Sequence, residues 1–111
     1  MGRVKRGEVW WVAGGVYASK PRPAVILQDD RFDGTESVTV CPFTTTPADA
    51  PLLRYPVSAD ASNGLEHDSR LMIDKVTTVR RTNVIRHAGK LSSAQLIEVE
   101  RLVMVFLGLA E

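Results

Sequence analysis

Apolar residues recur along most of the chain in short runs separated by turn-forming residues, a pattern that predicts strands. We expect strands over residues 7–13, 23–28, 37–43, 53–57, 70–75 and 86–90. Residues 76–85 stay ambiguous, because β-branched residues are mixed with a possible turn at Thr82-Asn83. The 37–43 segment has no clearly polar face, so we expect both of its faces to be covered near its end. Pro56 interrupts the 53–57 segment and favours an edge strand.

The last part of the chain has the spacing of an amphipathic helix. Ser92 is the expected N-cap, with Gln95 three residues later as its capping-box partner, and Gly108 ends the helix. One face is expected to be apolar and comprises Leu96, Val99, Leu102, Val103, Phe106 and Leu107. The predicted fold class is therefore mainly β with a C-terminal α-helix. Several short strands favour a small antiparallel barrel or a strongly bent sheet, since closure removes exposed edges.

Composition sets limits on class and chemistry. The chain has 111 residues, which suits a single domain spanning 1–111, and its net charge of +1 excludes a polycation that binds nucleic acid by bulk charge. The lone Cys41 excludes an intramolecular disulfide and is expected to be buried, while His67 and His87 lack metal-ligand spacing, so no metal site is expected. No apolar run approaches the roughly 20 residues that span a bilayer, and a cytoplasmic protein without a membrane segment is expected.

The most unusual stretch is Lys20-Pro21-Arg22-Pro23 at the entrance of a predicted strand. Each proline stiffens the backbone and keeps the residue before it extended, so Arg22 is held in place and suits the binding of an anion such as phosphate. A solvated turn arginine is the alternative. Thr44-Thr45-Thr46 leaves the 37–43 strand. If these strands are antiparallel neighbours, Arg22 and Thr44 share one rim, although such threonines also serve simply as turn residues.

Five motifs occur together in one order and spacing. They are Lys-Arg-Gly-Glu-Val-Trp at 5–10, Arg-Pro-Ala-Val-Ile-Leu at 22–27, Val-Thr-Val-Cys-Pro-Phe-Thr at 38–44, Ile-Asp-Lys-Val-Thr-Thr-Val at 73–79 and Gly-Lys-Leu-Ser at 89–92. In this combination the chain resembles, over nearly its whole length, the MazF/PemK-like (Kid) toxins of type II toxin–antitoxin modules.

The resemblance implies a fold, an activity and partners. The fold would be a small SH3-like antiparallel β-barrel of the PemK/CcdB type, assembled as a homodimer. The activity would be that of a sequence-specific endoribonuclease that needs no metal or other cofactor. It would cleave single-stranded RNA to 2′,3′-cyclic phosphate and 5′-hydroxyl ends, and so inhibit translation and growth. A cognate antitoxin would place its C-terminal segment in the RNA groove.

The resemblance also implies roles for single residues. Arg22 matches the family's catalytic arginine and Thr44 its catalytic threonine, with Thr45 as the adjacent alternative. The nucleophile would be the 2′-hydroxyl of the RNA, with Arg22 stabilising the charged phosphate, while the general base stays open. The predicted RNA contacts are Lys20, Thr45, Lys75, Arg80 and Arg81. The segment from Lys75 to Lys90 is basic and has no acidic residue, which suits a phosphate backbone, although a solvated face is the alternative.

Three points leave alternatives open. The 13–20 loop is short and lacks a Ser-Glu-Gln-like run that many members carry, and Lys75 stands where many members have glutamine, so the cleavage preference is not carried over. Of Trp10 and Trp11, one could stack on a base while the other packs in the core. A CcdB-like, non-enzymatic poison of a protein target such as DNA gyrase would share the barrel without needing Arg22, and an inactive member would only bind the antitoxin.

Overall fold

A computed structural model describes residues 3–14 and 20–110, so most of the 13–20 loop lies outside the described residues. The described elements are β1 (Glu8–Val12), β2 (Arg22–Ile26), the 3-10 helix η1 (Asp30–Phe32), β3 (Ser37–Thr44), β4 (Arg54–Val57), β5 (Ser69–Met72), η2 (Ile73–Lys75), β6 (Thr77–Arg80), η3 (Arg81–Asn83), β7 (Val84–Lys90) and α1 (Ser93–Phe106).

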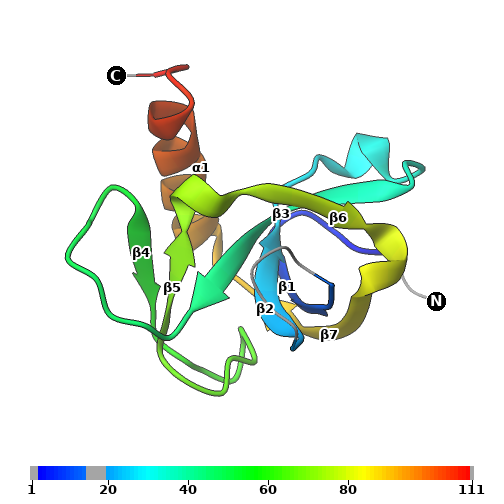
Figure 1. The fold of residues 1–111 in the computed structure, drawn as a ribbon, viewed down its shortest axis with the longest axis horizontal. Coiled ribbons are helices and arrows are strands. Elements are labelled where there is room, and N and C mark those ends of the chain that lie inside the picture. The colour runs from blue at the N-terminus through cyan, green and yellow to red at the C-terminus, as the bar shows by residue number, and fades with distance from the viewer. Residues whose placement is uncertain (1–2, 15–19, 111) are drawn as a thin grey trace.

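The strands form one antiparallel sheet that coils around itself, with α1 at one side (Figure 1). Neighbouring strands follow the order β4-β5-β3-β2-β1-β7, and β6 also pairs with β3. The prediction of a mainly β fold with a C-terminal helix is confirmed, and so is the edge position of β4. The sheet is barrel-like, but in the described residues its hydrogen-bonded ladder does not close, because β4 and β7 remain at its two ends.

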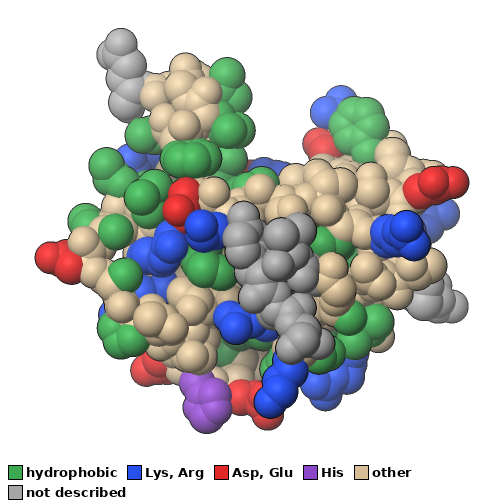
Figure 2. All heavy atoms as spheres, viewed as in Figure 1, with side chains coloured by type: hydrophobic (Ala, Val, Ile, Leu, Met, Phe, Trp, Pro, Cys, Tyr) green, Lys and Arg blue, Asp and Glu red, His purple; other side chains and the backbone are tan. Residues whose placement is uncertain are grey.

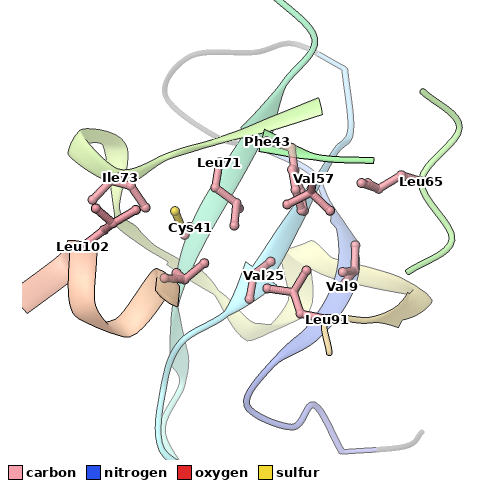
Figure 3. Close-up of a cluster of buried hydrophobic side chains, with 11 residues drawn as sticks. Val9, Val25, Cys41, Phe43, Val57, Leu65, Leu71, Ile73, Leu91 and Leu102 are labelled. Atoms are coloured by element: carbon pink, nitrogen blue, oxygen red, sulfur yellow. The ribbon is translucent and has the colours of Figure 1, made fainter. Parts of the chain in front are cut away.

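Strand β3 separates two buried clusters, as its mixed pattern predicted. Cys41 and Phe43 point into a first cluster, which Figure 3 shows together with residues from β1, β2 and β5. Val38 and Val40 point into a second cluster on the opposite face. Val99 and Leu102 of α1 cover the first cluster. Because β3 is buried on both faces, it is the central strand of the fold and fixes the position of Thr44 at its end.

One edge of β3 is shared by two strands. Ser37 to Val40 pair with β6, whereas Phe43 and Thr44 pair with β5. Between these two ladders β3 has Pro42, which has no N–H to donate. The segment that joins β5 to β6 turns away from β3 here and forms η2. The expected strand over 70–75 was therefore wrong in its second half: it ends at Met72. Leu71 and Ile73 nonetheless enter the same cluster.

Helix α1 begins as predicted. The Ser92 side chain accepts from the Gln95 backbone N–H, and the Gln95 side chain accepts from the Ser92 backbone N–H. The end differs from expectation, because Phe106 and Leu107 are 48% and 58% exposed rather than packed. Val103 still packs against the first cluster, but the helix extends beyond the sheet that it covers, so Phe106 and Leu107 remain largely uncovered by the described residues (Figure 1).

The loop between β4 and β5 is packed tightly on β7. Its Asn63 is buried, and the Asn63 side chain donates to the Ser58 carbonyl and accepts from the Leu65 N–H. A Cβ at Gly89 would lie 2.2 Å from the Ser62 carbonyl oxygen, so only glycine allows this approach. The loop thus clamps β7 against the rest of the sheet.

Candidate active site

Arg22 and Thr44 lie on neighbouring antiparallel strands, the arrangement on which their expected meeting at one rim depended. Ala24 of β2 is opposite Pro42 of β3, and both strands continue for two more residues in the direction that leads to Arg22 and Thr44. Continuing that register places Arg22 opposite Thr44 and on the same face of the sheet. A guanidinium and a hydroxyl, distant in sequence, therefore share one rim.

The Thr44 side chain is held in place. It is 9% exposed, and its Oγ1 accepts a hydrogen bond from the Thr46 backbone N–H at 3.2 Å. A hydroxyl that accepts one bond still has its own hydrogen to donate. Thr44 thus combines a turn role with a donor function, and the two alternatives considered from sequence are not exclusive. Thr45 follows immediately and is exposed.

Arg22 differs from most other arginines of the protein. Within the described residues no hydrogen bond or ion pair to its side chain is found, and the side chain is exposed. In contrast, Arg6 pairs with Glu100, Arg54 with Asp74 and Arg101 with Glu98. An uncompensated guanidinium between two prolines is preorganised for an external anion.

A second arginine at this rim was missed from sequence. Arg70 of β5 is directly opposite Thr44, on the side away from β2. Its strand was expected, but nothing in the sequence indicated that its first residues pair with the end of β3. Figure 2 shows Lys and Arg side chains gathered over the region where β5 and the end of β3 lie in Figure 1.

The other predicted RNA contacts are spread along β3. Lys20 is exposed and precedes Arg22 by two residues, and Lys75 is half-buried in η2, beside the middle of β3. Arg80 is opposite Ser37 at the start of β3, and the adjacent Arg81 donates from Nε to the Thr35 carbonyl at 2.7 Å. The structure thus brings Lys20 and Thr45 near the Arg22–Thr44 rim, but leaves Arg80 and Arg81 at the opposite end.

The two tryptophans have different surroundings. Trp10 is buried, donates from Nε1 to Glu8 at 3.1 Å and meets His87 edge-to-face with ring centroids 5.3 Å apart. Trp11 is half-buried, and the Arg86 guanidinium lies 5.0 Å from its ring centroid. Trp10 is therefore the core residue of the pair, and Trp11 is the one that a base could reach.

Other chemistry is scarce in the part of the chain that the structure describes. No group of three or more His, Cys, Asp or Glu side chains there could hold a metal ion. His67 is exposed, as expected for a loop residue. Cys41 is buried as predicted, and burial together with the nearby Asp74 raises the pKa of its thiol to about 12. Among the described helices none has the length and hydropathy to cross a membrane.

Known proteins share both this sequence pattern and this fold. Residues 5–107 match the PemK-like, MazF-like toxins of type II toxin–antitoxin systems. This chain belongs to that toxin family. It is 48% identical over 108 residues to the probable endoribonuclease MazF of Mycolicibacterium smegmatis, covering 96% of this chain and 99% of that relative. These findings confirm the resemblance inferred from the five motifs.

Solved structures of PemK/MazF toxins superimpose closely on this one. The Mycobacterium tuberculosis toxin MazF-mt6 has a TM-score of 0.79 at 25% identity, covering 94% of this chain and 99% of that one. MazF in the MazE–MazF complex of Deinococcus radiodurans has a TM-score of 0.81 at 18% identity, covering 99% and 100%. The second likeness is one of fold alone.

Proposed function

We propose that this PemK/MazF-family chain works as a single toxin domain with endoribonuclease activity on single-stranded RNA. The observation that supports this most is the placement of Arg22 opposite Thr44, with no anionic side chain bound to Arg22 among the described residues. The relative that is 48% identical is itself named a probable endoribonuclease.

The proposed mechanism uses the RNA's own 2′-hydroxyl as the nucleophile. Its oxygen attacks the adjacent phosphorus while the 5′-oxygen of the next nucleotide leaves, giving a 2′,3′-cyclic phosphate and a 5′-hydroxyl. Arg22 stabilises the negative charge on the pentavalent phosphate, and Thr44 donates its hydroxyl hydrogen to a phosphate oxygen. Arg22 stays protonated at neutral pH, so it acts by electrostatics rather than as a base. Orientation of the RNA for in-line attack supplies part of the rate.

Predicted contacts extend the RNA site beyond the two catalytic residues. Lys20 and Thr45 adjoin the rim and would hold nucleotides next to the cleaved bond. Lys75 would contact RNA over the middle of β3. Arg80 and Arg81 stay predicted contacts for RNA that reaches the start of β3, although Arg81 already bonds to Thr35.

The proposed partners are a second copy of the chain and an antitoxin. Large apolar residues of the C-terminal segment are exposed, namely Ile97, Met104, Phe106, Leu107 and Leu109. Burial of such a surface favours association, and we propose a homodimer. The second proposed partner is a cognate antitoxin, which we expect to occupy the RNA groove; the structural neighbour from D. radiodurans is a MazE–MazF complex. The proposed location is the cytoplasm, where RNA substrate is present.

The test is cleavage of a long single-stranded transcript in EDTA by wild type, Arg22→Ala and the control Arg31→Gln. Arg31 is an exposed arginine of η1 that already pairs with Asp29, the N-cap of that helix. Wild type and Arg31→Gln should cut at one recurrent short sequence and leave cyclic phosphate ends, whereas Arg22→Ala should not cut. Equal cutting by Arg22→Ala, with its fold verified by circular dichroism, would refute the proposed site.

Because the end of α1 is exposed and could contact a protein target, the CcdB-like alternative is tested in the same experiment. Such a poison would inhibit a protein target through this helix and would not need Arg22. If no protein variant, wild type included, cuts RNA, while wild type and Arg22→Ala inhibit DNA gyrase equally, the alternative replaces the endoribonuclease.

A further inference from the structure

Three adjacent strands place three polar side chains in one row. Arg70 of β5 pairs with Thr44 of β3, and the β2–β3 register, continued two residues beyond its last pair Ala24–Pro42, brings Arg22 of β2 opposite Thr44. The three side chains then face the same side of the sheet. Neighbouring strands lie about 4.8 Å apart, so the two arginine backbones flank Thr44 at a separation of about 10 Å. This row is longer than a single phosphate group is wide.

Arg70 is uncompensated within the described residues. Its cross-strand neighbours are Thr44 on β3 and Pro56 on β4, neither of which carries a charge. No ion pair or hydrogen bond to its side chain is found there, although the side chain is half-buried. The nearest contrast is Arg54 on β4, which is also half-buried and pairs with Asp74. A partly desolvated guanidinium without a partner is costly unless an anion from outside completes it.

We propose that Arg70 binds the RNA phosphate adjacent to the scissile one, so that the row holds two consecutive phosphates with Thr44 between its two cations. The inference rests on the proposed endoribonuclease function. Arg22 then serves the reacting phosphate, and Arg70 fixes the register and direction of the strand that passes over it. A contact to a phosphate carries no base information, so Arg70 contributes affinity and position rather than sequence choice.

This role has a specific kinetic signature. Loss of a charge-assisted contact to a non-reacting phosphate raises KM by about tenfold and leaves kcat within about twofold. The slope of log affinity against log salt falls by about 0.7, the value for one single-strand phosphate contact. The positions cut in a long transcript stay the same. If Arg70 had only a structural role, its substitution would leave the slope of log affinity against log salt unchanged.

The experiment first maps the cut sequence in a long transcript and then uses a short RNA oligonucleotide that contains it. kcat and KM are measured for wild type, Arg70→Gln, Arg70→Lys and the control Arg31→Gln. Affinity is titrated at several salt concentrations with the same oligonucleotide carrying a 2′-deoxy nucleotide at the cut position, which prevents cleavage. Arg70→Lys keeps the charge and should recover most of the affinity and the salt slope.

A second variant tests the same charge without changing Arg70. Pro56→Glu places a carboxylate opposite Arg70 on the exposed edge strand, and Pro56→Gln is its neutral control. Pro56→Glu should reproduce the raised KM of Arg70→Gln, and Pro56→Gln should not. This pair gives a result even if Arg70→Gln fails to fold.

The outcomes separate this inference from the proposed function. Unchanged KM and salt slope in Arg70→Gln and Pro56→Glu, with normal cutting by wild type, overturn the role of Arg70 alone. A large fall in kcat at constant KM also overturns it, because Arg70 would then act on the reacting phosphate. Absence of any cutting by wild type overturns the proposed function and this inference together.

Discussion

The two ends of β3 differ in how many of their arginines have a partner inside the protein. At its end, Arg22 and Arg70 flank Thr44, and the described residues provide no carboxylate for either. Around its start two arginines have internal partners, since Arg81 donates to Thr35 and Arg31 pairs with Asp29 at 3.1 Å. The exposed Arg80, opposite Ser37, has no such partner among the described residues. The bonds from Arg31 also lower the pKa of the Asp29 carboxyl. A net charge of +1 thus conceals a division between arginines that stabilise turns and arginines that remain available.

The difference shows why local compensation matters more than total charge for anion binding. An arginine whose charge is already matched by an internal carboxylate, as in the Arg31–Asp29 pair, gains little from binding phosphate. An arginine preorganised without a partner gains the full charge-assisted bond. The comparison can be tested at both ends and in the middle of the strand.

Substitution of Arg22 should have the largest effect. Arg22→Ala should lower kcat by about 10²–10³-fold, the loss typical for removal of one group that stabilises transition-state charge. Arg22→Lys keeps the charge but loses the planar fork, so it should recover only part of the rate. Single-turnover cleavage of an RNA oligonucleotide measures the rate of both variants. Full activity of Arg22→Ala would show that the unpartnered arginine at the end of β3 has no catalytic role.

Removal of the Thr44 hydroxyl should have a smaller effect. Thr44→Val keeps the shape but loses the donor to phosphate and the acceptor for Thr46, so kcat should fall about 10–10²-fold. Thr44→Ser should retain most activity. Thr45→Val is the matched neighbour, because Thr45 is exposed and follows β3. A greater rate loss in Thr45→Val than in Thr44→Val would transfer the catalytic role to Thr45.

Substitution of Arg81 should mainly affect stability. Arg81→Gln removes donors to the Thr35 carbonyl and hydroxyl, at a cost of about 1 kcal/mol in the free energy of unfolding. Its effect on RNA affinity should be smaller than that of Arg70→Gln. Urea denaturation and RNA titration measure the two quantities. Wild-type stability combined with a large loss of affinity would place the start of β3 in the RNA site instead.

Cys41, in the middle of β3, should show the smallest response. Because its folded-state pKa is raised to about 12, the native thiol should not react with a disulfide reagent at pH 8, whereas the chain in urea should react at once. The thiol's contribution to the free energy of unfolding is complete below its ordinary pKa of about 9 and declines as pH rises toward 12. Rapid native labelling would show that the middle of the strand opens.

The parts of this fold that depend on local pattern were predictable. The β2 and β3 segments have apolar runs of strand length, and the Ser92–Gln95 capping box marks the start of α1. The Arg22–Thr44 pair followed from two neighbouring antiparallel strands, a local arrangement in the chain. The family resemblance added the roles of both residues.

The parts that depend on distant pairing were not predictable. Residues 73–75 have strand-like composition, but they turn as η2 because the strands on either side pair with the same edge of β3 around Pro42. The place of Arg70 at the rim was recognised only from its pairing with Thr44. Phe106 has helical spacing like that of Leu102, yet whether it is covered depends on where the sheet ends.

The pairing of β1 with β7 has a consequence for the biosynthesis of the protein. Glu8 is opposite Lys90, and Arg6 is tied to Glu100, so the first strand finds its outer neighbour only in the last quarter of the chain. A nascent chain emerging from the ribosome can pair β2 with β3 early, but its sheet stays incomplete until β7 and α1 have been synthesised. A protein that cleaves RNA would in this way lack its complete fold until the segment that contains β7 and α1 has left the ribosome.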